Sequence, residues 1–443
     1  MMSNNKVLFW SFTVALGGFL FGFDTAVISG GEQTIQKLWS LSDTMIGQMV
    51  AMALYGTVIG ALIGGIPADK LGRKVTLFWI ALLYLISAIG SALAPEIYSL
   101  MFFRFIGGLA VGVSSVVAPM YISEISPREK RGRLTALFQF NIVLGILIAF
   151  LSNYFIGGSG ENWRWMLGVE SFPAALFLIL VLFVPRSPRW LIVKRGLIEE
   201  ARDVLKIINP STADNHVDEL LASRSSSQES SFNEFISGKY KFPIILAFLI
   251  AFFNQLSGIN AIIYYAPRIF EATGLEKSIA LLSTVGIGVT NLIATLIGMA
   301  VIDRFGRKNL MYVCSFGYII TLTSITITFF SGIGSGTMLV PFLIFAFIAS
   351  HAVGQGAVIW VFISEIFPNN VRSYGNSLGA GTHWVFAALI AATFPFVTGN
   401  LGAGPTFAVF TIMTVFQLLF VWKMMPETKG KSLEELQSLL INQ

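Results

Sequence analysis

Three charged residues interrupt the apolar stretches of this chain. Asp24, Arg104 and Glu170 each lie within or near the edge of a long apolar run. An unpaired ion in hydrocarbon is costly, so we expect the three groups to meet one another or water. Two carboxylates that share one guanidinium cannot both be neutralised, so one of them should take up a proton readily. This pattern favours proton binding, and a purely structural ion pair is the alternative.

A second set of polar residues could bind hydroxyl groups. The stretch "NQLSGINAIIYY" places Asn254, Gln255 and Asn260 within one apolar run, followed by Tyr264. Amides offer donors and acceptors to the hydroxyls of a sugar, and aromatic rings offer flat apolar surfaces to its C–H groups. On an unbroken helix Gln255 and Asn260 would be turned apart by about 140°. We therefore expect them to flank a polar cavity without sharing one line.

These side chains require helices that cross a membrane. The chain of 443 residues is 55% hydrophobic and only 12% charged, which is typical of a polytopic membrane protein. A helix needs roughly 20 apolar residues to cross about 30 Å of hydrocarbon. An all-α fold with twelve spans is predicted, at 7–29, 46–68, 75–94, 98–121, 133–155, 164–185, 242–265, 278–302, 309–331, 339–363, 373–397 and 404–425. Counting residues puts Asp24, Arg104 and Glu170 at a similar depth. Each lies roughly 8 to 9 Å from the end of its span on the side opposite the N terminus.

The distribution of Lys and Arg predicts the orientation of the spans. Loops on the side of the N terminus carry 24 of the 29 basic residues, and loops on the other side carry three. Because basic loops stay in the cytoplasm, we expect a multi-pass plasma (inner) membrane protein with both termini cytoplasmic. The first span is longer than a signal peptide and lacks a small-x-small cleavage pattern, so we expect it to be retained.

The sequence argues against several other functions. The net charge of +5 reflects the loop bias, and no stretch is typical of a nucleic-acid-binding groove. The single cysteine, Cys314, lies within a predicted span and excludes an intrachain disulfide. We find no nucleotide-binding loop, metal cluster or nucleophile with a base. We therefore expect neither an enzyme nor a cofactor or metal.

An internal repeat divides the chain. Asp69 and Asp303 are 234 residues apart, as are Arg73 and Arg307, in "DKLGRK" and "DRFGRK". The stretches "YISEISP" and "FISEIFP" are 241 residues apart. A six-span unit used twice in parallel explains both spacings. The predicted division is an N-terminal half at 1–185, a cytoplasmic helical linker at 186–241, a C-terminal half at 242–425 and a cytoplasmic tail at 426–443.

The predicted linker contains two short helices. "LIEEARDVLKII" places Ile198, Ala201, Leu205 and Ile208 on one helical face, and "DNHVDELLAS" indicates a second helix. "SRSSSQESS" is typical of a flexible linker. A simple tether and a regulatory element both remain possible.

Motifs spread over nearly the whole chain form a specific combination. They are "FGFDTAVISG", "DKLGRK", "RFIGGLAVGVSSVVAPMYISEISP", "RGRL", "VPRSPRWL", "QLSGINAIIYYAP", "DRFGRK", "WVFISEIFP" and "PETKGKSLEEL". In this combination the chain resembles the sugar porter family of the major facilitator superfamily, which includes bacterial xylose and arabinose proton symporters and animal glucose facilitators. The resemblance implies alternating access, with a sugar held at mid-membrane between two six-helix halves.

The resemblance also implies roles for single residues. Asp24 corresponds to the proton-coupling carboxylate of the symporters, which is uncharged in the facilitators, and Arg104 and Glu170 correspond to its partners. Ile146 and His383 stand where many members have an amide, so the identity of the sugar is not carried over. The expected substrate-binding residues are Ile146, Asn254, Gln255, Asn260, Tyr264, Trp360, His383 and Trp384.

On the cytoplasmic side, the resemblance implies a network of charges that latches the inner gate when the carrier faces outward. In "PRSPR", Arg186 stands where the family has an acid, so the corresponding contact of the first half is in doubt. His351 is explained equally well by a structural hydrogen bond and by a role in the cavity. The expected gate residues are Arg73, Glu124, Arg131, Asp303, Arg307, Glu365, Arg372 and Glu427.

The function that these features favour is proton-coupled symport of a monosaccharide, either a hexose or a pentose, by a monomeric protein in the lipid bilayer. One alternative is a facilitative uniporter in which Asp24 is only structural. Another is a sugar sensor that does not transport. Such sensors carry long cytoplasmic tails, whereas about 18 residues follow the last predicted span here.

Overall fold

The structure is a computed structural model that describes residues 2–127, 130–157, 161–225, 232–368, 370–431, 435–436 and 440. Helices joined by turns account for these ranges, and no strand occurs within them. Twelve helical segments are long and apolar enough to cross a membrane. The prediction of an all-α protein with twelve spans is therefore confirmed.

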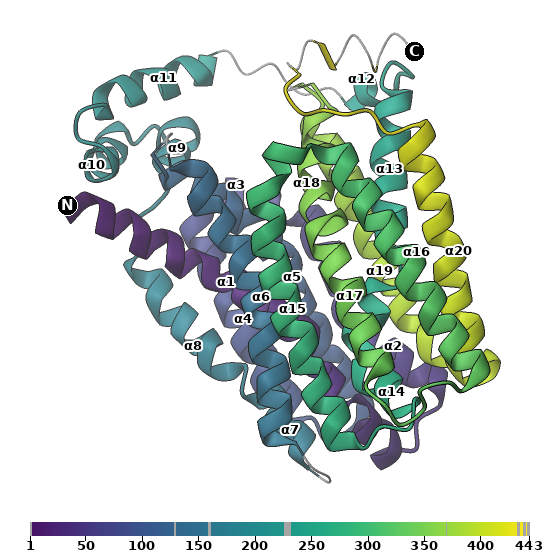
Figure 1. The fold of residues 1–443 in the computed structure, drawn as a ribbon. Coiled ribbons are helices and arrows are strands. Elements are labelled where there is room, and N and C mark those ends of the chain that lie inside the picture. Colours follow the sequence, from purple (N-terminus) through teal and green to yellow (C-terminus); the bar gives the residue numbers. More distant parts are fainter. Residues whose placement is uncertain are drawn as a thin grey trace. The chain divides into compact units, whose positions relative to one another are not determined.

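Most spans are single helices, and three are interrupted. The single-helix spans are α1 (Met2–Leu38), α2 (Asp43–Ile63), α4 (Arg73–Leu93), α5 (Ile97–Ile125), α6 (Arg131–Ile156), α15 (Lys277–Phe305), α16 (Arg307–Ser331), α19 (Arg372–Leu401) and α20 (Ala403–Lys423). The interrupted spans are α7 (Asn162–Gly168) with α8 (Ser171–Leu180) and η1 (Val181–Phe183), α13 (Lys241–Leu256) with α14 (Ile259–Glu271), and α17 (Leu339–Val353) with α18 (Gln355–Glu365). Figure 1 shows the course of the chain through these helices.

The first helix extends further than predicted. Hydropathy places its end near residue 29, whereas α1 continues to Leu38. Glu32, Gln33 and Gln36 lower the hydropathy of this last part, yet their side chains form hydrogen bonds with other residues of the fold. The helix therefore continues where the apolar run stops, and Asp24 lies further from the end of its helix than the sequence indicates.

A glycine interrupts the seventh span. Gly258 has a φ of 84°, in the left-handed region that glycine adopts without a steric penalty. A Cβ on this residue would lie 2.6 Å from the ring of Phe410, so the position has no room for a side chain. The chain turns here between α13 and α14, which changes the relative direction of the side chains on either side.

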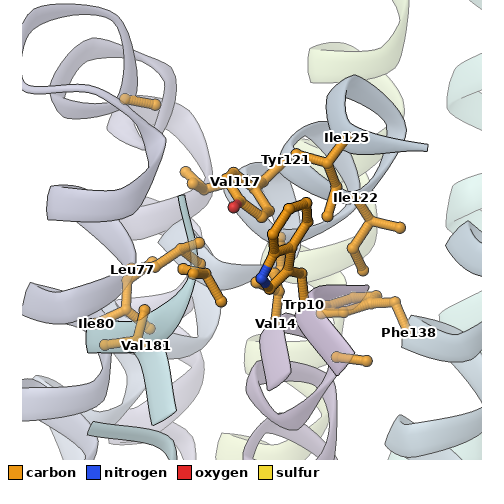
Figure 2. Packing of buried hydrophobic residues seen from close by; sticks show 14 of the residues in the cluster. Trp10, Val14, Leu77, Ile80, Val117, Tyr121, Ile122, Ile125, Phe138 and Val181 are labelled. Atoms are coloured by element: carbon orange, nitrogen blue, oxygen red, sulfur yellow. The ribbon is translucent and has the colours of Figure 1, made fainter. Parts of the chain in front are cut away.

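One compact unit comprises residues 1–25, 55–149 and 164–228. Its core brings together aromatic and aliphatic side chains from α1, α4, α5 and α6, among them Trp10, Leu77, Tyr121 and Phe138 (Figure 2). Within this unit α4 packs along α5 and also contacts α8. Burial of this apolar surface holds the helices that carry Asp24, Arg104 and Glu170.

The first part of the predicted linker, up to α11, belongs to this unit and forms short helices. They are α9 (Pro188–Trp190), η2 (Leu191–Arg195), α10 (Ile198–Ile208) and α11 (Ala213–Ser225), near the helix α3 (Gly65–Lys70) that precedes α4. In α10 the predicted residues Ala201, Leu205 and Ile208 are buried together with Val204, whereas Ile198 is only partly buried. The part of the predicted flexible stretch from 226 to 231 lies outside the described residues.

The other compact unit comprises residues 26–54, 150–163 and 229–443. Its most extensive helix pairs are α16 with α20, α13 with α19, and α15 with α17 (Figure 1). The short helix α12 (Phe232–Ile236) inserts Phe235 against Phe367 and Tyr374. Cys314 is buried on α16 and lies against the α17–α18 junction at Gly354. The division into halves at 185 and 242 stays a prediction.

Candidate functional site

Asp24 and Arg104 form a buried ion pair between α1 and α5. Arg104 Nη1 lies 2.6 Å from Asp24 Oδ1, and both side chains are at most 5% exposed. The guanidinium also donates weakly to the backbone carbonyl of Asp24, at 3.4 and 3.5 Å. A buried pair with this geometry recovers part of the desolvation cost of its two ions, whereas either ion alone would be strongly unfavourable.

Glu170 lies beside this pair without joining it. The residue precedes α8 at the break after α7, and it is buried. Its carboxylate interacts electrostatically with both Asp24 and Arg104. The described residues provide no hydrogen-bond or ion-pair partner for the carboxylate of Glu170 within the usual distances. Asp24, Arg104 and Glu170 are here called the charge cluster. Within it, Asp24 and Arg104 are paired and Glu170 is not.

The charge cluster holds two carboxylates and one guanidinium. Arg104 neutralises one carboxylate at a time, so two ionised carboxylates leave one negative charge in excess in an apolar setting. Tyr84 of α4 is fully buried and lies within electrostatic range of both Asp24 and Glu170.

Gln255 is the centre of a hydrogen-bonded amide cluster made by Asn254, Gln255, Asn260 and His383. Its Nε2 donates to Asn254 Oδ1 at 2.9 Å, and its Oε1 accepts from Asn260 Nδ2 at 3.0 Å. The predicted angle of about 140° between the side chains of Gln255 and Asn260 assumed an unbroken helix. That assumption is wrong, because the helix breaks at Gly258. The turn at Gly258 brings the two amides into direct contact.

His383 of α19 completes the amide cluster. Gln255 Nε2 lies 3.1 Å from His383 Nδ1 and 3.2 Å from Nε2, so the ring offers an acceptor to this amide. The imidazole lies 5.1 Å from the ring of Trp360 and 4.7 Å from that of Trp384, measured between centroids. Polar donors and acceptors thus lie next to flat apolar surfaces, the combination that a sugar requires.

The other predicted binding residues lie on separate helices and differ in burial. Tyr264 lies on α14 past the break, with 2% of its surface exposed, whereas Trp360 on α18 is 39% exposed. Ile146 is a buried residue of α6. His351 forms a hydrogen bond through Nδ1 with the hydroxyl of Tyr318 and stacks on its ring. This contact is the hydrogen bond that the structural interpretation of His351 expects, and its role in the cavity stays a prediction.

The repeated motifs form two matching arginine clusters, one in each compact unit. Arg73 contacts Asp69 at 3.1 Å and Glu124 at 3.0 Å. Arg307 contacts Asp303 at 3.1 Å and Glu365 at 2.8 Å.

A hydroxyl completes each cluster. Ser187 Oγ donates to Glu124 at 2.5 Å, and Thr428 Oγ1 donates to Glu365 at 2.6 Å. The sequence repeat is therefore also a repeat of side-chain contacts.

The remaining predicted gate residues differ from this pattern. Arg372 donates through Nε to the carbonyl of Phe367 at 3.2 Å. Arg131 is exposed and lines a small cavity of about 100 Å³ next to Glu124. Neither arginine forms an ion pair with a carboxylate of the described residues. Glu427 accepts hydrogen bonds from backbone amides at the start of α16.

Sequence reasoning missed a further charged contact at the end of α1. Arg268 of α14 donates from Nε to Glu32 Oε1 at 2.9 Å and from Nη2 to Glu32 Oε2 at 2.5 Å. Arg268 also donates to Gln36, which in turn donates to Asp43 of α2. The sequence did contain a signal for this contact. Three polar residues, Glu32, Gln33 and Gln36, follow the apolar run at spacings that continue a helix.

Comparison with known proteins assigns the chain to a family. Residues 10–440 match the family described as "Sugar (and other) transporter". The chain belongs to the sugar porter family. It is a transporter with the major facilitator fold and not an enzyme, and it is a multi-pass membrane protein.

Curated relatives of this sugar porter align over nearly their full length. The D-xylose transporter of Levilactobacillus brevis is 36% identical, over 96% of this chain and 94% of the relative. The D-xylose-proton symporter of Escherichia coli K12 is 35% identical, over 98% and 96%. The glucose transporter GlcP of Staphylococcus epidermidis is 36% identical, over 98% and 97%.

Solved structures of similar sequence share the fold. The inward open conformation of the xylose transporter XylE from E. coli matches with a TM-score of 0.86 and 33% identity, over 97% of this sugar porter and 99% of that chain. The proton:xylose symporter XylE bound to 6-bromo-6-deoxy-D-glucose matches with a TM-score of 0.78 and 33% identity, over 99% and 100%.

Proposed function

We propose that this sugar porter is a proton-coupled monosaccharide symporter. The observation that carries the proposal is the buried Asp24–Arg104 pair with a second carboxylate, Glu170, beside it. Relatives that are D-xylose-proton and arabinose-proton symporters, at 35% and 36% identity, support proton coupling. The substrate is a hexose or a pentose, and the working unit is a monomer.

Coupling follows from exchange of partners within the charge cluster. When Asp24 is ionised it holds Arg104 and so ties α1 to α5. A proton on Asp24 releases the guanidinium, which is then free to pair with Glu170. Because this exchange alters the contact between two helices, proton binding biases the equilibrium between the conformations of the carrier.

The amide cluster binds the sugar. Asn254, Gln255 and Asn260 supply donors and acceptors for the hydroxyls, and Tyr264 adds a hydroxyl and an aromatic face. Trp360 and Trp384 offer apolar surfaces to the ring carbons. His383 and Ile146 supply an imidazole and an apolar side chain instead of amides, and they set which sugar is preferred.

Charged contacts at both ends of the spans control access. The arginine clusters with Glu124 and Glu365 belong to the gate on the cytoplasmic side of the plasma (inner) membrane. Both termini lie on this side. Arg131, Arg372 and Glu427 join these gate contacts during the transport cycle. Arg268 and Glu32 close the opposite side. Pairs made in only one conformation shift the equilibrium even when each contributes little by itself.

Proteoliposomes that contain a pH-sensitive dye test the proposal. Addition of pentoses and hexoses outside should acidify the lumen when the matching sugar enters with protons. Asp24→Asn should lose acidification and concentrative uptake but keep sugar exchange, whereas Asp203→Asn, an exposed position on α10, should behave as wild type. Concentrative uptake that is unchanged in Asp24→Asn would sink the coupling claim, and sugar entry without proton movement in the wild type would identify a uniporter.

A further inference from the structure

The internal repeat contains one position at which the two copies have opposite charge. Glu124 and Glu365 are 241 residues apart, and the same spacing relates Ser187 to Thr428. The residue before each hydroxyl is Arg186 in the first copy and Glu427 in the second. The hydroxyl contacts are equivalent in the two copies, so Arg186 and Glu427 occupy matching positions.

In the second copy, the acid at this position neutralises the start of a helix. Glu427 accepts from the amide of Arg307 at 2.9 Å and from the amide of Lys308 at 3.0 Å. These are the first amides of α16, which carry partial positive charge and lack partners within the helix. A single carboxylate therefore supplies both the acceptors and the negative charge that this helix end requires.

In the first copy, the corresponding helix end has no such acid. The amides of Arg73 and Lys74 begin α4, and the described residues place no side-chain acceptor on them. Arg186 cannot substitute, because a guanidinium only donates hydrogen bonds. In the part of the chain that the structure describes, the first copy therefore lacks the anion that its counterpart has at this site.

A cavity of about 530 Å³ lies beside this helix start and is bounded by Arg186. It is lined by Leu71, Val75, Arg186, Trp190, Arg195 and Leu197. The guanidinium of Arg195 lies over the ring of Trp190 at 5.2 Å, and Lys74 is close enough to Arg186 for their charges to interact. The cavity is thus basic on one side and apolar on the other.

The cations around the cavity are poorly neutralised. Among the described residues Arg186 forms one ion pair, with Glu200 at 3.7 Å, and both side chains are about half exposed (51% and 44%), so the pair contributes little. Arg195 has no carboxylate within ion-pair distance among the described residues. The nearby acid Asp69 is already engaged by Arg73 and Lys194. The cavity therefore has an excess of positive charge.

We propose that this cavity binds the phosphodiester headgroup of an anionic phospholipid. One phosphate carries the negative charge and the acceptor oxygens that Glu427 supplies in the second copy, and helix starts flanked by arginine are favourable phosphate sites. The proposal does not depend on which solute the transporter carries.

The apolar surroundings favour a lipid over a soluble phosphate. Val75, Trp79 and Ile86 are exposed on one side of α4, and they continue from the cavity along the span. Acyl chains can lie along this apolar stripe while the headgroup occupies the basic cavity. A basic pocket at the end of a membrane span is typical of sites for anionic lipid headgroups.

Lipid binding to the purified full-length protein tests the proposal. Phosphatidylglycerol, with phosphatidylcholine as the neutral comparison, is titrated in detergent while bound lipid is counted by native mass spectrometry and unfolding is followed by heating. The wild type should bind phosphatidylglycerol selectively and unfold at a higher temperature when it is bound. Arg186→Gln should weaken this binding roughly fivefold, because it removes one positive charge from the site. Arg186→Glu should weaken it roughly 30-fold, because it changes the charge of the site by two.

Two controls make the test decisive. Lys206→Gln removes an exposed charge on α10 that does not line the cavity, and it should bind lipid as the wild type does. Arg186→Glu recreates the acid of the second copy, so without lipid it should unfold at a higher temperature than the wild type. Equal binding of phosphatidylglycerol by the wild type and folded Arg186→Glu overturns the proposal. Stabilisation of the wild type by glycerol phosphate as strong as that by the lipid also overturns it, in favour of a soluble anion.

Discussion

Arg268 of α14 binds both carboxylate oxygens of Glu32 on α1, with Nε at 2.9 Å and Nη2 at 2.5 Å. The glutamate side chain is fully buried and the arginine is only 20% exposed. Two parallel charge-assisted hydrogen bonds fix the geometry of the contact as well as its strength. The pair therefore joins the last turns of α1 to the second segment of an interrupted span.

Glu32→Gln should destabilise the protein strongly, because it leaves the guanidinium of Arg268 without its carboxylate. Breaking a buried pair from one side costs about 3–5 kcal/mol, whereas replacing both partners costs less. Thermal unfolding should therefore show a large loss for Glu32→Gln and a partial recovery for the double variant with Arg268→Gln. Glu271→Gln, which alters a hydrogen bond from the neutral Gln33 and leaves the Glu32–Arg268 pair in place, should cost about 1 kcal/mol. A double variant less stable than Glu32→Gln would contradict this reading.

Arg104→Met and Glu170→Gln should have different consequences. Loss of Arg104 leaves Asp24 and Glu170 buried without a cation, and the free energy of unfolding should fall by about 3–5 kcal/mol. Glu170 has no ion-pair partner in the described residues, so Glu170→Gln should change stability by less than about 1 kcal/mol. Proton-driven uptake in proteoliposomes should nevertheless fall in Glu170→Gln. A stability loss as large as that of Arg104→Met would make Glu170 a structural partner instead.

His383→Asn should change sugar preference more than protein stability. The imidazole accepts from Gln255 and lies 4.7 Å from Trp384, so its replacement alters both the hydrogen bonds and the aromatic surface. One hydrogen bond gained or lost by a hydroxyl corresponds to roughly a tenfold change in affinity. Quenching of tryptophan fluorescence by a panel of sugars should show a changed ratio of affinities. An equal shift for every sugar would show that His383 does not determine specificity.

Gln255→Ala should abolish sugar binding, because it removes the group that connects Asn254, Asn260 and His383. The same fluorescence titration measures the loss. Gln417→Ala is the matched control, since this buried glutamine donates to Ser315 outside the amide cluster. Wild-type affinity in Gln255→Ala would remove the seventh span from the sugar site.

Substitutions of Glu427 should lower stability in graded steps. Glu427→Gln keeps acceptor oxygen at the start of α16 but loses the charge, and should cost several tenths of a kcal/mol. Glu427→Ala removes both and should cost about 1 kcal/mol. Thermal unfolding of the two variants beside Asp203→Asn measures the steps. Equal stability of Glu427→Ala and the wild type would show that the cap does not contribute.

The sequence predicted the elements that depend on composition and repetition. The twelve spans follow from long apolar runs, because the bilayer demands them. Residue counting predicted one depth for Asp24, Arg104 and Glu170, and the structure pairs the first two, although α1 ends nine residues beyond the predicted span, at 38 instead of 29. The end of the apolar run marked the relevant depth even though the helix continues past it.

The features that escaped prediction depend on contacts between distant residues. Nothing local distinguishes Gly258 from the glycines that lie inside helices, yet its φ of 84° breaks the seventh span and brings Gln255 to Asn260. Glu32 lies beyond the predicted end of the first span at residue 29, and its partner Arg268 lies 236 residues away in the chain. Sequence patterns report what a segment buries on average, and they do not report which single partner it will find.

The chain has one native thiol, Cys314, and the fold encloses it completely. A maleimide reagent added to the folded protein should therefore leave the wild type unlabelled. Any cysteine introduced at a gate or along α4 can then be labelled selectively without first removing the native residue. The burial of this one side chain makes the protein suitable for fluorescence and spin-label measurements of its motions.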